Sequence, residues 1–117
     1  MSRPDWLADI AAFQAAGDKL PLTELAVGDL LKVATARSTY FFQIIEPRQR
    51  LALMWKQGSD LPPLAVRLMG GTLGLSSSID PRQLTCCGSL EYTRDEGART
   101  HITSMIQELA LLRRTSA

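Results

Sequence analysis

The sequence predicts a mainly β domain, a small antiparallel β-barrel of five or six strands with an N-terminal helix and a short C-terminal helix. From residue 30 onward, apolar residues recur with the period of two that is typical of β-strands. The runs are short and separated by turn-forming residues, which favours an antiparallel meander. The chain has 117 residues, of which 45% are hydrophobic. That is enough for one core rather than two, so we expect a single domain over 1–117.

The predicted N-terminal helix spans residues 4–16. Trp6, Ile10 and Phe13 follow i, i+4, i+7 spacing, so they would share one apolar face. Gly17 suits the end of such a helix. The apolar face must cover something, either the barrel that follows or a partner protein.

The predicted barrel occupies residues 30–107. Its strands are expected at 30–35, 40–45, 51–56, 64–68, 84–93 and 100–107. Strands this short commonly close into a barrel, which removes the sheet edges. The segment Gly70–Ser78 is rich in glycine and serine and predicts a loop or a bulged edge. The leucine-rich tail 108–114 predicts a short helix.

One segment carries a resemblance to known proteins. Residues 28–40 read G-D-L-L-K-V-A-T-A-R-S-T-Y, and residues 70–74 read G-G-T-L-G. The chain resembles small bacterial proteins in which a G-D-x-L-x-V-x-T-x-x-S-x-Y hairpin opens a compact β-barrel. The resemblance covers residues 25–106. It implies the barrel fold and a bacterial cytoplasmic setting, and it implies no chemistry, since we know of no established activity for these proteins.

Charge is nearly balanced but unevenly distributed. The formal net charge is +1, which gives no global electrostatic case for nucleic acid or membrane. Residues 1–29 carry two basic and five acidic side chains, whereas residues 30–94 carry eight basic and four acidic ones. This pattern is typical of a solvated surface, and a basic face for an anionic partner is the sharper alternative.

The cysteines and the absence of long apolar runs predict the compartment. Cys86 and Cys87 are adjacent, so on a strand their side chains would point to opposite faces and could not form a disulfide. Such thiols are typical of a reducing compartment. The first residues lack the apolar run of a signal peptide, and no run of eighteen apolar residues exists for a membrane span. We therefore expect a cytoplasmic protein.

Catalytic and metal chemistry find little support in the residue pattern. The single histidine, His101, and two adjacent thiols do not supply a four-ligand zinc site, so we predict no metal and no cofactor. Cys86 or Cys87 could pair with His101 as thiolate and imidazolium. However, Cys86 lies on an apolar face and Cys87 has no activating neighbour in the sequence. The Gly70–Ser78 segment lacks the G-K-[ST] end of a phosphate-binding loop. A Cys/His enzyme is therefore the least favoured function.

Association is the leading prediction, because two strands are apolar on both faces. In 40–45 and 51–55, apolar residues occupy consecutive positions, a pattern typical of strands that are buried on both sides. The second face must be covered by the predicted helices or by another subunit. We therefore predict a non-catalytic protein-interaction or assembly module that forms homo-oligomers. The predicted contact residues are Trp6, Ile10, Phe13, Phe41, Ile45 and Met54.

A small nucleic-acid-binding barrel is the alternative. Such barrels bind single strands with aromatic platforms in a basic groove. The basic residues expected to carry this function are Arg48, Arg50, Lys56 and Arg67. Affinity that falls steeply with salt would identify this function.

Overall fold

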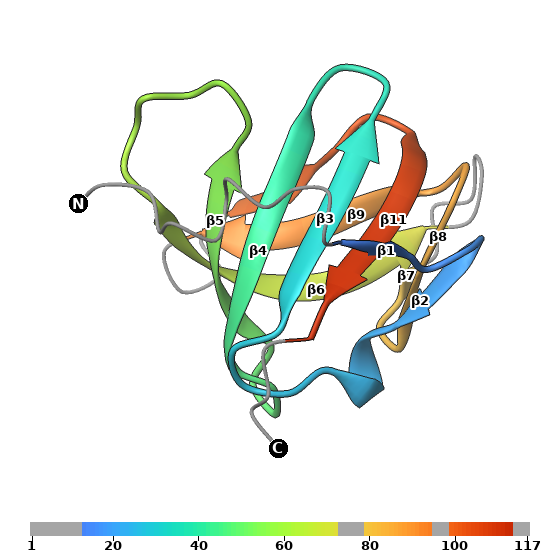
Figure 1. The fold of residues 1–117 in the computed structure, drawn as a ribbon, viewed down its shortest axis with the longest axis horizontal. Helices are drawn as coiled ribbons and strands as arrows, with labels where there is room; N and C mark the ends of the chain where they lie inside the picture. The colour runs from blue at the N-terminus through green and yellow to red at the C-terminus, as the bar shows by residue number, and fades with distance from the viewer. Residues whose placement is uncertain (1–12, 73–78, 95–98, 114–117) are drawn as a thin grey trace.

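The computed structural model describes residues 13–72, 79–94 and 99–113, and this part of the chain is mainly β, as predicted (Figure 1). A single 3-10 turn, η3 (Leu22–Glu24), is the only helical element among these residues. None of them forms a helix long and apolar enough to cross a membrane. The strands are β1 (Gln14–Ala15), β2 (Lys19–Pro21), β3 (Leu30–Thr35), β4 (Thr39–Glu46), β5 (Leu51–Lys56), β6 (Leu64–Thr72), β7 (Ile79–Asp80), β8 (Gln83–Thr85), β9 (Ser89–Arg94), β10 (Arg99–Ile102) and β11 (Ile106–Leu112).

Nine of these strands form one antiparallel sheet. Its order is β1-β11-β3-β4-β5-β6-β9-β10, and β7 pairs with β6 off this path. The strands β3 to β6 are a meander of consecutive neighbours, as the short runs and turns predicted. The last strand, β11, returns to pair with β3 on one side and with β1 on the other. A separate pair, β2 with β8, lies at the right-hand side of Figure 1, where β8 contacts β6 of the larger sheet.

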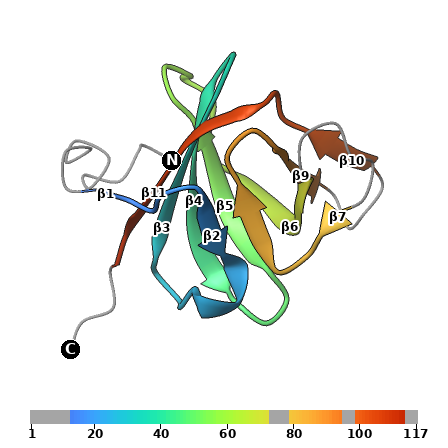
Figure 2. The same cartoon turned by 90° about the vertical axis from the view of Figure 1, so that its right-hand side faces the viewer.

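The prediction of a closed barrel is wrong. Within the described strands, the path of the large sheet ends at β1 and at β10, which do not pair with each other. The single strand predicted at 100–107 is divided at 103–105, so β10 pairs with β9 while β11 pairs with β3. Backbone hydrogen bonds from Thr103 to the Leu90 oxygen (2.9 Å) and from Cys87 to the Ile106 oxygen (2.8 Å) hold the start of β11 beside the start of β9. The sheet therefore curls around the core without closing (Figure 2).

Both predicted helices are also wrong where the structure describes them. Of the helix predicted at 4–16, residues 4–12 lie outside the described part, and Gln14 and Ala15 form β1. The tail predicted as helical from residue 108 is instead β11. Both segments pair with a neighbouring strand, and this long-range pairing outweighs the local helix propensity of alanine and leucine.

The main core lies on the inner, concave face of the curled sheet. β3 and β4 face β6 and β9 across it (Figures 1 and 2), and the segment 20–25 and β8 close one end. Its buried side chains are Leu20, Leu22, Leu25, Leu31, Val33, Phe42, Ile44, Ala52, Met54, Val66, Leu68, Leu84, Leu90, Tyr92, Ile106 and Leu109.

Three bulges bend the strands that surround this core. The pairing register shifts between Ile44 and Glu46 in β4, between Leu68 and Gly70 in β6, and after Ile106 in β11. A bulge bends its strand and increases the local twist. The curl of the sheet is therefore concentrated in β4, β6 and β11.

A glycine explains how β6 continues at residue 70, where the sequence predicted a loop or a bulged edge. Gly70 has a φ of +136°, and a Cβ at this position would overlap the backbone oxygen of Asp80. Glycine adopts this conformation without the steric cost that other residues have. The bulge at Gly70 therefore lets β6 continue beside both β7 and β9.

Candidate functional site

A second apolar cluster lies on the outer face of the sheet, across β11, β3, β4 and β5. We call it the outer strip. It consists of Leu30, Phe41 and Trp55, with Phe13, Leu53 and Leu112 packed against them. The strip arises because these strands carry apolar residues at consecutive positions, one set pointing inward and the other outward.

The outer strip is covered within the single chain. Phe41 is 2% exposed and Trp55 is 4% exposed, although both lie on the outside of the curled sheet. The ring of Phe13 packs on Phe41 with centroids 5.7 Å apart and planes tilted by 55°. Phe13 directly precedes β1, so the start of the described chain lies on the strip.

The structure separates the predicted contact residues. Phe13 and Phe41 meet on the outer strip. Ile45 is exposed at the bulge of β4, away from the centre of the strip. Met54 points into the main core instead, and its neighbours on β5 supply the outward side chains. The remaining two predicted residues, Trp6 and Ile10, lie outside the described residues.

The outer face of β6 and β10 differs from the strip because its apolar side chains are exposed. Ile102 of β10 is 64% exposed, and Met69 of β6 is also exposed. The register places Ile102 opposite Glu91 of β9, and Glu91 opposite Gly70 of β6, so these residues share one face. Among the described residues, no strand pairs with the other side of β10. β10 is therefore an open sheet edge with an exposed apolar side chain.

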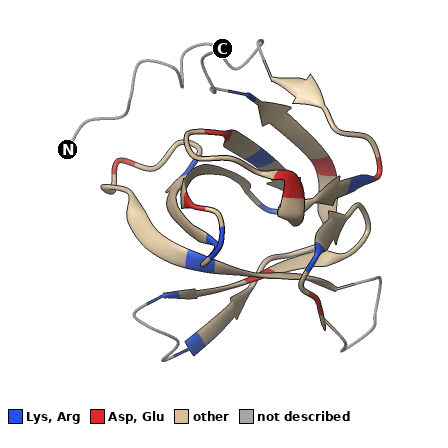
Figure 3. Ribbon diagram, turned by 90° about the horizontal axis from the view of Figure 1, so that it is seen from below, with Lys and Arg blue, Asp and Glu red and all other residues tan. Residues whose placement is uncertain are grey.

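The four basic residues of the nucleic-acid alternative do not gather in one patch. Arg48 and Arg50 lie in the β4–β5 turn, and Arg67 is paired with Leu51 at the neighbouring end of β5. Lys56 lies at the opposite end of β5. A side-chain nitrogen of Arg50 donates to the Pro81 backbone oxygen. Lysine and arginine positions are spread over separate elements (Figure 3), so no continuous basic groove follows from them.

The thiols and the histidine are not brought together as neighbours. Register pairs His101 with Tyr92, whereas Cys87 lies in the turn before β9, beyond the β9–β10 ladder. Burial raises the pKa of the Cys86 thiol, and the nearby Asp18 carboxylate adds to the effect. The Cys86 thiol also lies 3.7 Å from the Gly17 oxygen. In the described part of the chain, no three His, Cys, Asp or Glu side chains are placed to hold a metal ion.

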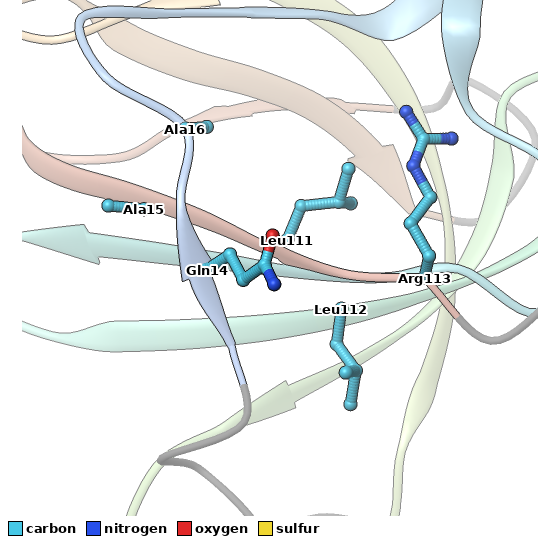
Figure 4. Close-up of a pocket in the computed structure, with 6 residues that line it drawn as sticks. All are labelled: Gln14, Ala15, Ala16, Leu111, Leu112 and Arg113. Atoms are coloured by element: carbon cyan, nitrogen blue, oxygen red, sulfur yellow. The ribbon is translucent and has the colours of Figure 1, made fainter.

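A cavity of about 300 Å³ lies between β1 and the end of β11 (Figure 4). Leu111 and Leu112 project to opposite sides of β11 there (Figure 4). Arg113 also lines it, but its guanidinium donates to Asp29 Oδ2 and to the Glu24 oxygen, each at 3.0 Å. The Asp29 carboxylate is fully buried. Arg113 therefore holds the loop before β3 to the end of β11.

A second cavity, the mouth pocket, opens at the end of the inner face of the sheet. Its volume is about 200 Å³. The described residues that line it are Tyr40, Met54, Trp55, Lys56, Ser59, Leu61, Pro62, Leu64 and Tyr92. Because β4, β5, β6 and β9 all contribute, the pocket depends on the curl of the sheet.

Sequence reasoning missed both the edge strand and the mouth pocket. A strand was predicted at Thr100 and Ile102, but it was placed inside a closed barrel, which has no free edge. Tyr40, Lys56 and Tyr92 lie far apart in the sequence, and only the long-range strand order brings them together. No family model, curated protein or solved structure matches the chain.

Proposed function

We propose that this chain is a non-catalytic assembly module that self-associates through the open edge of its sheet at β10. The observation that carries the proposal is the free side of β10 beside the exposed Ile102. An unpaired strand edge is a template for pairing with another chain. The four residues of β10 contain no proline or lysine, which are the usual protections of such an edge.

Hydrogen-bond directions identify the backbone groups that are available. The Thr103 backbone N–H donates to the Leu90 oxygen, toward β9. Successive residues of a strand direct their N–H and C=O groups to alternate sides. His101 and Arg99 therefore also face β9, whereas Thr100 and Ile102 direct theirs to the free side.

This alternation selects one register for two identical edges. In an antiparallel pair, facing residues lie on the same side of the sheet. A two-fold axis at His101 places Thr100 of each copy opposite Ile102 of the other. Each pair of Thr100 with Ile102 then exchanges two backbone hydrogen bonds, which gives four per dimer. In this register Arg99 of one copy does not lie opposite Arg99 of the other.

The edge is short, so association is expected to be weak. Stable interfaces bury about 1,600 Å² in total, which is far more than a four-residue strand can bury. We expect a monomer in dilute solution and a dimer as the concentration approaches the millimolar range. The outer strip is not the assigned contact, because it is already covered within the chain.

The test compares Thr100→Pro with Thr100→Val. Proline removes the outward N–H and no bond to β9, and it is tolerated on an edge strand. Valine keeps the N–H and is the matched control. Sedimentation velocity from micromolar to millimolar protein should show dimers for the wild type and for Thr100→Val, and monomers for Thr100→Pro.

Two results would overturn the proposal. Monomers at every concentration for all three proteins would show that the edge does not self-associate. Association that survives in Thr100→Pro would move the contact to another surface. Circular dichroism and thermal unfolding of each variant would first confirm that the sheet is intact.

A further inference from the structure

The mouth pocket combines an apolar floor with aromatic walls. Met54 and Leu64 belong to β5 and β6, where the register pairs them directly, and they form the floor. Tyr40 and Tyr92 line it from β4 and β9. Such a mixture of apolar walls and few polar groups is typical of small-molecule sites, which often lie in the mouths of curved sheets.

Ring contacts hold the aromatic walls in place. The imidazole of His101 stacks on Tyr92 with centroids 5.3 Å apart and planes 15° apart. Tyr40 packs against Phe42 of the main core at 6.4 Å. Both tyrosines are therefore supported from outside the pocket, and their rings are preorganised for a ligand.

The polar groups of the pocket favour an anion. Lys56 lines it, and the register pairs Lys56 with Tyr40. No Asp or Glu is among the described residues that line the pocket, and no ion pair between described residues involves Lys56. Burial raises the pKa of the Tyr92 phenol, and the nearby Tyr40 raises it further by a smaller amount. The phenol therefore remains a neutral hydrogen-bond donor at physiological pH.

We propose that the mouth pocket binds a small planar aromatic carboxylate. The volume of about 200 Å³ is below the roughly 300–1,000 Å³ of sites for larger ligands, so a single ring is the appropriate size. The ring lies between the tyrosines and the apolar floor. Its carboxylate meets the Lys56 ammonium and a tyrosine hydroxyl, both of which donate hydrogen bonds.

A nucleobase is the competing occupant, because aromatic side chains also stack on bases. The described lining contains no Asn, Gln, Asp or Glu, which are the side chains that pair with several base-edge groups. A single cation beside apolar walls suits one carboxylate better than a base edge. His101 of β10 touches the pocket through Tyr92, but the free backbone groups of Thr100 and Ile102 are not part of its lining, so occupancy and self-association have separate readouts.

The experiment is a titration of the full chain followed by two-dimensional amide NMR. The probes are benzoate, its neutral analogue benzyl alcohol, and uridine monophosphate. Benzoate should shift the amides around Tyr40, Lys56 and Tyr92 saturably, with benzyl alcohol about tenfold weaker, as expected for loss of one charge-assisted bond. Lys56→Met should weaken benzoate by the same factor and leave benzyl alcohol unchanged. Lys19→Met, an exposed lysine on β2, is the matched control and should change neither.

Two outcomes would overturn the proposal. Equal affinity of benzoate for the wild type and for Lys56→Met, or no saturable shift at the pocket, would remove the carboxylate site. Tighter binding of uridine monophosphate than of benzoate would assign the pocket to nucleotides instead.

Discussion

The two halves of the large sheet differ in how far their outer faces are buried. The closed half, made of β11, β3, β4 and β5, packs its inner face on the main core and also buries the outer strip on its other face. The open half, made of β6, β9 and β10, packs its inner face on the main core and leaves outward side chains such as Arg67 and Ile102 exposed. Both halves share one core, so the difference lies entirely on the outer face.

This difference separates stability from recognition. Side chains buried on both faces of a strand contribute packing free energy twice, and truncating them leaves cavities. Exposed side chains at an edge contribute little to folding and are free to meet another molecule. We therefore expect the closed half to be sensitive to substitution and the open half to carry association.

The largest expected effect comes from truncating the outer strip. Phe41→Ala should lower the free energy of unfolding by about 3–5 kcal/mol, the usual range for a buried phenylalanine. Arg67→Ala, at an exposed position on the outer face of β6, should cost less than about 0.5 kcal/mol. Urea unfolding monitored by circular dichroism measures both. Equal losses would show that the two halves are packed alike and would break the comparison.

An intermediate effect is expected at the end of the closed half. Arg113→Met leaves the buried Asp29 carboxylate without its guanidinium partner and should cost about 2 kcal/mol, since Arg113 itself is half exposed. Lys32→Met breaks the 2.8 Å pair with Glu108 and should cost about 0.5 kcal/mol.

Salt distinguishes these two ion pairs. The Lys32 effect should vanish in about 1 M salt, where the Debye length is about 3 Å. The Arg113 effect should persist, because Asp29 is fully buried. If both effects vanish together in salt-dependent urea unfolding, the Asp29 pair behaves as a surface pair.

The smallest expected effect lies in the turn between β8 and β9. Burial raises the pKa of the Cys86 thiol, so near neutral pH a smaller fraction of it is the reactive thiolate. That fraction increases as the pH rises. Cys87 is exposed. Iodoacetamide should therefore modify Cys87→Ser, which retains Cys86, more slowly than Cys86→Ser, which retains the exposed Cys87. A Cys87 that reacts far faster than a free cysteine would instead support the Cys/His enzyme.

The alternation of apolar and polar residues predicted the central strands well, because each of these strands packs one face on the main core. Leu31 and Val33, for example, point inward from β3 as their spacing indicates. The same rule could not orient β5, since consecutive residues from Leu51 to Trp55 are apolar. Met54 was therefore assigned to the contact surface, although Leu53 and Trp55 are the residues that point outward.

The failures arose where distant partners decide the local structure. Residues 108–112 have the leucine content of a helix, but β3 offers an edge that they complete as β11. The mouth pocket requires the strand order that brings β4, β5, β6 and β9 together, which no local stretch of sequence contains. The open edge at β10 follows from the interruption at 103–105, and the alternation pattern does not reveal it.

The return of β11 to β3 also sets an order of events in time. The hairpins from β3 to β6 join neighbours in the sequence and can form as soon as those residues have been synthesised. The other side of β3 waits for Ile106–Leu112, whose partners in β3 were synthesised 71 to 82 residues earlier. Pairings across such a separation are the slow ones in folding. During synthesis, the side of β3 that pairs with β11 is therefore a temporary sheet edge until Ile106–Leu112 have been made.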